Sequence, residues 1–206
     1  NCPGFGSVAK SIATSALRHL GWIDETVQPF LSRPLAATGS EIRALIRAGA
    51  DSVKLEGAAG NERMIARLVG SGIPVMGHLG LTPQFYHSLG GYKVQGRDGD
   101  AAMKLRADAL RLEAAGCFSL VLECVPESLS GEISRSLAIP VIGIGAGREV
   151  DGQVLVLHDL LGLSGFRPRF ARRYLDGAAL VKAAIDGYCR DVASGEFPSE
   201  AEAFVS

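Results

Sequence analysis

The chain has 206 residues, of which 47% are hydrophobic and 21% charged, and its formal net charge at pH 7 is −1. A chain of this length is expected to form one domain and to bury a substantial core without staples. The near-neutral charge offers no basic field for nucleic acid or for an anionic membrane, so neither is an expected partner. No signal-peptide pattern and no long apolar run occurs, which favours a cytoplasmic protein that does not span a membrane.

The first 38 residues lack the rhythm of the rest of the chain. They contain three prolines, Pro3, Pro29 and Pro34, and one helical stretch over residues 7–20, but no recognisable buried strand. We therefore predict that residues 1–38 form an atypical N-terminal segment, and that residues 39–206 form the main domain.

From residue 40 onward, helical and strand patterns alternate, with short glycine and proline punctuation between them. Continuous Val, Ile and Leu runs predict buried parallel strands over 51–56, 73–78, 118–124, 139–144 and 153–158. Amphipathic or capped stretches predict helices over 40–48, 61–70, 99–115, 127–137 and 177–193. A long polar loop separates the second strand from the third helix, and loops of that length inside a compact domain are usually functional.

This alternation is typical of an α/β fold with a parallel sheet, and we predict a TIM-barrel-like architecture. About five of eight strands are found, so the barrel is predicted to be incomplete. The tail is predicted to be helical, with apolar positions recurring along 177–193 and packing outside the barrel: Leu180, Val181, Ala184, Ile185 and Tyr188.

The four cysteines show no metal-ligand spacing and no CxxC pair. They are Cys2, Cys117, Cys124 and Cys189. Isolated reduced thiols with structural or inert roles are the expectation for such a pattern in a cytosolic protein.

Polar groups follow several of the apolar runs, and barrel enzymes carry their reactive side chains at the ends of strands. Lys54 and Glu56 are two residues apart, so their side chains point to the same face of a strand. Together they could orient an α-keto acid and hold a divalent ion. A buried Lys–Glu pair with a purely structural role explains the same spacing equally well.

Glu123 ends a run of Leu and Val, and burial among such neighbours would raise the pKa of a carboxyl group towards the range of a general base. It is the candidate for removing a proton α to a carbonyl, although a salt-bridged glutamate at the rim is the alternative. His78 could donate a hydrogen bond to a substrate carboxylate or enolate, or it could be a packed ring without a catalytic role.

Two further motifs have weaker readings. Gly143–Gly147 could cradle a phosphate, but it matches neither nucleotide fingerprint, so a tight turn is favoured. His158 with Asp159 is predicted to cap the last strand, and His19 and His87 have no predicted partners.

At these same residues the chain resembles ketopantoate hydroxymethyltransferases (3-methyl-2-oxobutanoate hydroxymethyltransferases). The resemblance covers about residues 40–200. The matching stretches are Val53–Gly57, Pro74–Gln84, Gly90–Arg97, Leu122–Pro126, Ile139–Gly147 and Asp151–Asp159.

The resemblance implies a TIM barrel of the phosphoenolpyruvate/pyruvate class. It implies Mg²⁺ as cofactor, 2-oxoisovalerate as substrate, 5,10-methylenetetrahydrofolate as co-substrate, a role in pantothenate biosynthesis and assembly into a homo-oligomer. By resemblance Lys54 would bind the keto acid, Glu56 would belong to the Mg²⁺ site, His78 would contact substrate and Glu123 would accept the proton.

The resemblance is incomplete before residue 40. The family carries a Gly-Asp-Ser-Leu-Gly motif and an Ala-Asp-Leu-Pro-Phe motif, whose aspartates complete the metal site, and neither occurs here. A truncated or frame-shifted gene would explain that loss. The sequence therefore leaves two alternatives to an active hydroxymethyltransferase. One is an inactive family member that retains fold and assembly surfaces, and the other is a related Mg²⁺-dependent carbon–carbon lyase, against which the Gly90–Arg97 loop argues.

Overall fold

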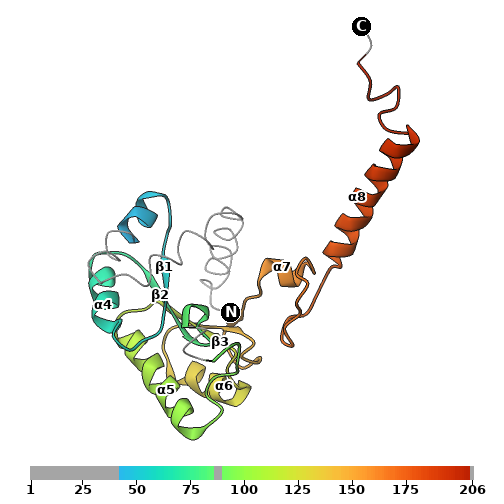
Figure 1. Ribbon diagram of the computed structural model, residues 1–206. Helices are drawn as coiled ribbons and strands as arrows, with labels where there is room; N and C mark the ends of the chain where they lie inside the picture. The colour runs from blue at the N-terminus through green and yellow to red at the C-terminus, as the bar shows by residue number, and fades with distance from the viewer. Residues whose placement is uncertain (1–41, 86–89, 205–206) are drawn as a thin grey trace. The chain divides into compact units, whose positions relative to one another are not determined.

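The computed structural model describes residues 42–85 and 90–204. The chain divides into two compact units, the first ending at Val154 and the second beginning at Leu155. The first unit contains the sheet and the second contains the C-terminal helices (Figure 1). The segment predicted as one partial-barrel domain thus contains parts of both units.

Five strands form one sheet in which neighbouring strands are also consecutive in the chain, in the order β1-β2-β3-β4-β5. All four pairings are parallel. The strands are β1 (Val53–Glu56), β2 (Val75–Gly80), β3 (Ser119–Glu123), β4 (Val141–Ile144) and β5 (Gly152–Gln153). A doubly wound sheet reverses its strand order at a switch point, whereas a (β/α) barrel adds strands in sequence. The described sheet has the sequential order of a barrel segment.

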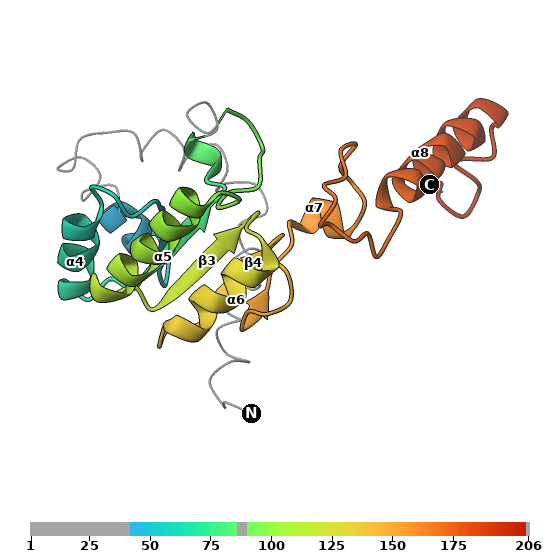
Figure 2. The same ribbon diagram turned by 90° about the horizontal axis from the view of Figure 1, so that it is seen from below.

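Helices connect the first four strands, as is usual for parallel pairing, whereas a loop of bends over residues 145–151 joins β4 to β5. Residues 42–47 are helical, and they are followed by α4 (Glu62–Gly70), the short 3₁₀ helix η2 (Pro83–Phe85), α5 (Gly99–Ala114) and α6 (Glu127–Ser136). Figure 2 shows α4, α5 and α6 side by side along one face of the sheet. The Asp98 side chain caps α5 by accepting a hydrogen bond from the Ala101 N–H at 2.8 Å, which explains why the helix begins there.

Apolar side chains are buried on both faces of the sheet. On the helix-covered face, Leu120 and Leu122 of β3 have no exposed surface and belong to the main core. On the opposite face, Val121 packs with Met76, Ile142 and Ile144 in a second, smaller cluster. Because both faces of these strands are buried, their sequences are continuous apolar runs rather than alternating apolar and polar residues.

The first four predicted strands and the helices between them are confirmed, although three of those strands begin two residues later than predicted. The prediction for 153–158 is wrong for most of its length, because β5 ends at Gln153 and residues 157–160 form helix α7 (Leu157–Leu160). In the described sheet β5 is an edge strand. The Val154 N–H still donates to the Gly143 carbonyl of β4 at 3.0 Å. From Leu155 onward the described residues show no further ladder hydrogen bond that would hold the run extended.

The second unit contains α7 and the long helix α8 (Gly177–Ser194). Helix α8 agrees with the predicted helix over 177–193 and ends at Gly195, whose positive φ of 78° is the usual backbone conformation of a helix stop. Leu180 and Ile185 on the predicted apolar stripe are 57% and 56% exposed. The packing of this helix outside a barrel stays a prediction. Within the described residues, no helix is long and apolar enough to cross a membrane.

Candidate active site

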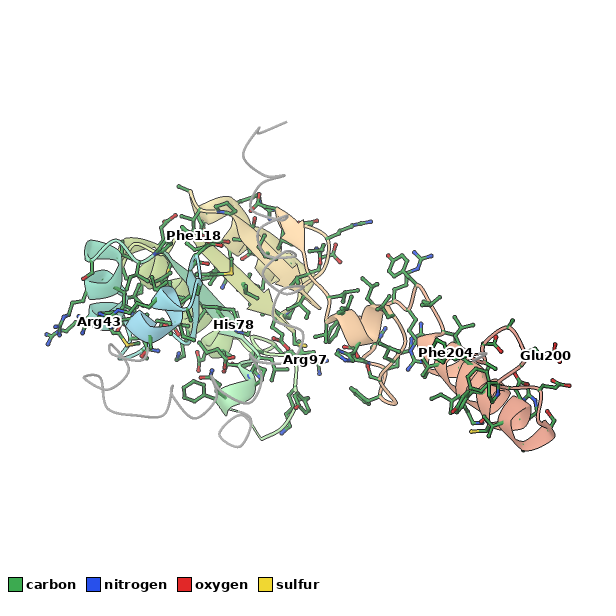
Figure 3. All side chains as sticks on the ribbon, turned by 90° about the horizontal axis from the view of Figure 1, so that it is seen from above. Arg43, His78, Arg97, Phe118, Glu200 and Phe204 are labelled. Carbon is green, nitrogen blue, oxygen red and sulfur yellow. The ribbon has the colours of Figure 1, made fainter. Side chains whose placement is uncertain are left out.

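Three neighbouring strands bring all four predicted site residues together. Parallel register places Glu56 of β1 opposite His78 of β2, and Gly80 of β2 opposite Glu123 of β3. Because alternate residues of a strand share a face, Lys54, Glu56, His78 and Glu123 all lie on the face of the smaller apolar cluster. His78 is labelled in Figure 3, within the first unit.

His78 is at the centre of this group. Its Nδ1 lies 3.0 Å from the Lys54 Nζ and 3.6 Å from Glu56 Oε1. Its Nε2 lies 3.2 Å from Glu123 Oε2. The side chains of His78 and Glu56 are 3% and 6% exposed, whereas that of Lys54 is 45% exposed. A buried imidazole thus connects two carboxylates, and the ammonium group faces solvent.

The distances indicate which tautomer His78 adopts. The Lys54 ammonium can only donate, so the shorter contact makes Nδ1 of the imidazole the acceptor. The proton of a neutral ring is then on Nε2, which faces Glu123. Despite the 3.2 Å distance, Nε2 is buried without an aligned hydrogen-bond acceptor in the described structure. It is therefore a donor that a substrate oxygen could satisfy.

Glu56 is held as an anion by its surroundings. Burial raises the pKa of this carboxyl group, but His78, the charge of Lys54 and the Gln84 N–H lower it more, so the pKa lies below its ordinary value. The Gln84 N–H donates to Glu56 Oε2 at 3.1 Å. Lys54 and Gln84 act in the same direction whether or not His78 is charged. Glu56 is therefore a carboxylate at neutral pH.

This shift predicts a pH dependence of stability. A carboxyl group whose pKa is lower in the folded state stabilises that state above the unfolded pKa, and the contribution disappears as the pH falls through the folded value. We expect wild type to exceed Glu56→Gln in free energy of unfolding at pH 7, and the difference to shrink below the ordinary value of 4.5. Urea denaturation from pH 7 to pH 3 measures it. A difference that widens in acid would contradict this account.

The backbone around Glu123 is tightly determined. The Leu81 N–H donates to the Glu123 carbonyl at 2.7 Å, and the Cys124 N–H donates to the Ile144 carbonyl at 2.9 Å. Cys124 has a φ of 50°, which is rare for a residue with a side chain and which ends β3 abruptly. Such local strain persists only where the surrounding structure enforces it. It fixes the position from which the Glu123 side chain projects.

Three contributors to this site are not among the residues predicted from the sequence. Gln84 acts through its main-chain N–H, which no residue pattern reveals, and Cys124 acts through its backbone conformation. Gly80 has a φ of 89°, and a Cβ there would lie 2.2 Å from the Glu123 carbonyl oxygen. A glycine inside a strand pattern often marks such a close backbone approach, so this signal was available.

The structure favours the predicted inert role for two of the cysteines. Burial raises the pKa of the Cys117 thiol to about 11. Burial, together with the charge of Glu123, raises the pKa of Cys124 to about 11 as well. Both thiols are thus protonated at neutral pH and poor nucleophiles. Cys189 is exposed, and Cys2 lies outside the described residues.

The remaining motifs are not part of this cluster. The glycine-rich turn packs on α6, since a Cβ on Gly147 would lie 2.4 Å from the Glu127 side chain and the Ser130 hydroxyl donates to the Ala146 carbonyl at 2.6 Å. This packing supports the tight-turn interpretation. His158 lies in α7, so it does not cap a strand as predicted. The predictions on His19 and His87 fall outside the described residues.

The described residues alone do not make a Mg²⁺ site. No group of three or more potential metal ligands occurs among them. Glu56 offers one carboxylate, with the Lys54 ammonium at 3.6 Å. Mg²⁺ demands six oxygens in nearly ideal octahedral geometry. Further oxygens would have to come from substrate, water or residues outside those described.

Fold and site together define a class of protein. It is an α/β protein with sequential parallel strands, in which a carboxylate, an imidazole and an ammonium group meet at the carboxyl ends of neighbouring strands, as in barrel enzymes that act on small acids. The model of the ketopantoate hydroxymethyltransferase family matches residues 8–200. The chain belongs to this family of transferases.

Curated relatives agree with this assignment. The 3-methyl-2-oxobutanoate hydroxymethyltransferase of Bdellovibrio bacteriovorus is 53% identical over 179 residues, covering 85% of this chain and 68% of the relative. The enzyme of that name from Salinibacter ruber is 48% identical over 197 residues, covering 95% of this chain and 74% of the relative. Matches to Francisella tularensis relatives cover 66% of those proteins.

The family match begins at residue 8, within the segment that was predicted to be atypical. Among solved structures, one titled as a lyase/mutase from Burkholderia cenocepacia J2315 is similar to this chain. The match covers 84% of this chain and 62% of the lyase/mutase chain, with 19% sequence identity and a TM-score of 0.41. That similarity is too low to support an argument. The fold assignment depends on the sheet itself and on the family match.

Proposed function

We propose that this chain transfers a hydroxymethyl group from 5,10-methylenetetrahydrofolate to 2-oxoisovalerate and so forms ketopantoate for pantothenate biosynthesis. The observation that carries the proposal is the contact chain Lys54–His78–Glu123, with Nζ–Nδ1 and Nε2–Oε2 distances of 3.0 Å and 3.2 Å. It occurs in a member of a family named for this transfer.

In the proposed reaction Glu123 removes the proton from C3 of the keto acid. The electron pair of that C–H bond is delocalised in the resulting enolate, whose C3 then forms a carbon–carbon bond to the one-carbon unit as the first of the two C–N bonds to folate breaks. Water replaces the second C–N bond and so supplies the hydroxyl group. The two folate nitrogens take up the proton from Glu123 and one proton from the water, and tetrahydrofolate leaves. Glu123 suits the first step because its side chain is 16% exposed, so a substrate can reach it while the remaining surface is shielded.

Two neighbours would stabilise the charge that develops on the substrate. Lys54 is the solvent-facing cation of the cluster and can pair with the keto acid carboxylate or with the enolate oxygen. The Nε2–H of His78 lacks an aligned acceptor, and a substrate oxygen near Glu123 would provide one. Both roles are assigned because the Lys54 ammonium and the His78 Nε2–H can still donate to a substrate oxygen.

The proposed cofactor is Mg²⁺, and Glu56 would supply one carboxylate ligand to it. When bound, the ion would polarise the ketone and acidify the adjacent C–H bond. We also propose a homo-oligomer and a cytoplasmic location. The free cysteines of the described chain agree with a reducing compartment.

A second candidate is a family member without catalytic activity. The specific observation in its favour is that the described residues form no group of three or more metal ligands. Such a protein would keep the fold and surfaces for assembly, but it would not hold Mg²⁺ tightly enough to enolise a keto acid.

Proton exchange distinguishes the two candidates. The purified chain is incubated in D₂O with 2-oxoisovalerate and Mg²⁺, and deuterium at C3 is followed by NMR; adding 5,10-methylenetetrahydrofolate allows ketopantoate to be detected by mass spectrometry. We expect exchange that depends on Mg²⁺, followed by product. Exchange without product would favour a different keto-acid enzyme, and no exchange would favour the inactive protein.

Calorimetry then tests the metal directly. We expect Mg²⁺ to bind measurably only when 2-oxoisovalerate is present, because the protein oxygens of the described site are too few without it. The titration compares wild type with Glu56→Gln, which should lose this binding. If Glu56→Gln binds Mg²⁺ as wild type does, the ion is held elsewhere and the assignment of Glu56 is wrong.

A further inference from the structure

An arginine-rich loop in the second unit has no role in the proposed chemistry. Four arginines occur within seven residues, at positions 167, 169, 172 and 173, and no acidic residue lies between Asp159 and Asp176. Three aromatic residues are interleaved with them, and Phe166 and Tyr174 are 73% and 66% exposed. We call residues 166–174 the arginine loop.

The arginine loop is anchored to the preceding helix. The Tyr174 N–H donates to the Leu160 carbonyl at the end of α7, and the Gly177 N–H donates to the Leu161 carbonyl, both at 2.9 Å. A Cβ on Gly162 would lie 2.3 Å from the Leu175 carbonyl oxygen, so the two backbone segments touch. Within the loop, Ala171 is only 2% exposed. The loop is thus a packed structure that presents its side chains in set positions.

Two of the four guanidinium groups stabilise the loop itself. Arg173 donates to the Ser164 carbonyl at 2.8 Å, and Arg167 donates to the Ala171 carbonyl at 3.4 Å. Arg172 lies over the Tyr174 ring, 5.4 Å from its centre. Arg169 is at the corner of a turn that the Ala171 N–H closes by donating to the Pro168 carbonyl. Each guanidinium still has N–H donors to spare.

None of these arginines forms an ion pair within residues 42–85 and 90–204. Neighbouring like charges repel each other, so such a loop is stabilised by an external anion. Planar guanidinium groups bind carboxylates with two parallel hydrogen bonds, and exposed aromatic rings offer a flat apolar surface beside them.

We propose that the arginine loop is a binding site for a small molecule that carries several carboxylates next to an aromatic ring. Arg169 and Arg172 bind the carboxylates, and Tyr174 with Phe166 contacts the ring. Identifying this ligand as the glutamate tail of the folate co-substrate depends on the proposed function, whereas the polycarboxylate site itself does not.

Charge balance argues against a nucleic acid at the same surface. From residue 155 onward the chain has six Lys and Arg against seven Asp and Glu, so the unit as a whole provides no long-range attraction for a polyphosphate. The positive charge is confined to one loop, which suits a compact anion with a few charges.

The test is the affinity of the full chain for tetra-γ-glutamate, a probe without folate ring or keto acid, measured by calorimetry at low salt. In Arg169→Ala/Arg172→Ala the dissociation constant should rise at least about tenfold, while the loop-stabilising Arg167 and Arg173 are kept. Lys182→Ala/Arg190→Ala on α8 is the matched control, since it removes the same charge from the same unit, and its affinity should be unchanged.

Several results would overturn the proposal. These are no binding of tetra-γ-glutamate at about 1 mM, an equal loss of affinity in the α8 control, and tighter binding of tripolyphosphate or of a short single-stranded RNA. Failure of the proposed function is recognisable separately. An enzymatically inactive chain that still binds tetra-γ-glutamate through Arg169 and Arg172 would keep the polycarboxylate site and remove only its identification with folate.

Discussion

Replacing Glu123 by glutamine is expected to lower kcat for ketopantoate formation by about 10²- to 10⁴-fold, the usual contribution of a positioned general base. The amide keeps the size and shape of the side chain but cannot accept the C3 proton. KM for 2-oxoisovalerate should change little, since Lys54 and His78 remain to bind it. Deuterium exchange at C3 should fall in parallel with kcat, because both depend on the same proton transfer.

The matched control for this variant is Glu127→Gln. Glu127 lies four residues further along the chain, at the start of α6, and its carboxylate pairs with Arg148 at 3.2 Å rather than with the cluster. It should keep nearly wild-type kcat. If Glu123→Gln retains more than about a tenth of wild-type exchange, another group removes the proton, and the role assigned to Glu123 would have to be abandoned.

Gly80→Ala should strongly destabilise the fold. A Cβ there would lie 2.2 Å from the Glu123 carbonyl oxygen and 2.7 Å from Val125 Cγ2, and the φ of 89° is itself unfavourable for alanine. The obstacle is backbone, which cannot rotate away. We expect a loss of about 3 kcal/mol or more in the free energy of unfolding, measured by urea denaturation.

Gly72→Ala separates the two causes of that loss. Gly72 has a similar φ of 82°, but a Cβ there would meet nothing within 4 Å. It should cost only the conformational strain, about 1 kcal/mol. Equal losses in the two variants would show that β2 and β3 do not approach each other as closely as described, and the account of how Glu123 is positioned would fail.

The two variants probe different links between structure and function. Glu123→Gln alters one functional group and leaves the backbone unchanged, whereas Gly80→Ala disturbs the backbone of β2 and β3 that positions this group. A partly folded Gly80→Ala protein should also lose activity, because a displaced Glu123 carbonyl moves the whole end of β3.

The identity of most elements was decided locally, and the sequence was enough to find them. The runs around Leu120 and Val141 were recognisable as buried strands because both of their faces are covered, and the end of α5 could be placed from the glycine that follows it. The residues of the four-residue site could also be predicted from the sequence, since the spacing of Lys54 and Glu56 places them on one face of a strand and Glu123 ends an apolar run.

What the sequence could not determine depends on contacts between distant segments. The run that begins at Val154 is as apolar as the other strands, but beyond the Val154 N–H it makes no hydrogen bond to the described sheet. Extended backbone is stable only when its hydrogen bonds are met. The geometry of the site likewise arises only when β1, β2 and β3 pair. Pairing sets the register that places His78 between Glu56 and Glu123. It also brings the Gln84 N–H to Glu56, and it brings together the backbone of Gly80 and Cys124, which positions Glu123. The residue types of the site are thus a property of the sequence, whereas their distances and hydrogen bonds were decided by tertiary structure. The reason is that strand pairing joins residues that lie 22 positions apart between β1 and β2 and 43 positions apart between β2 and β3.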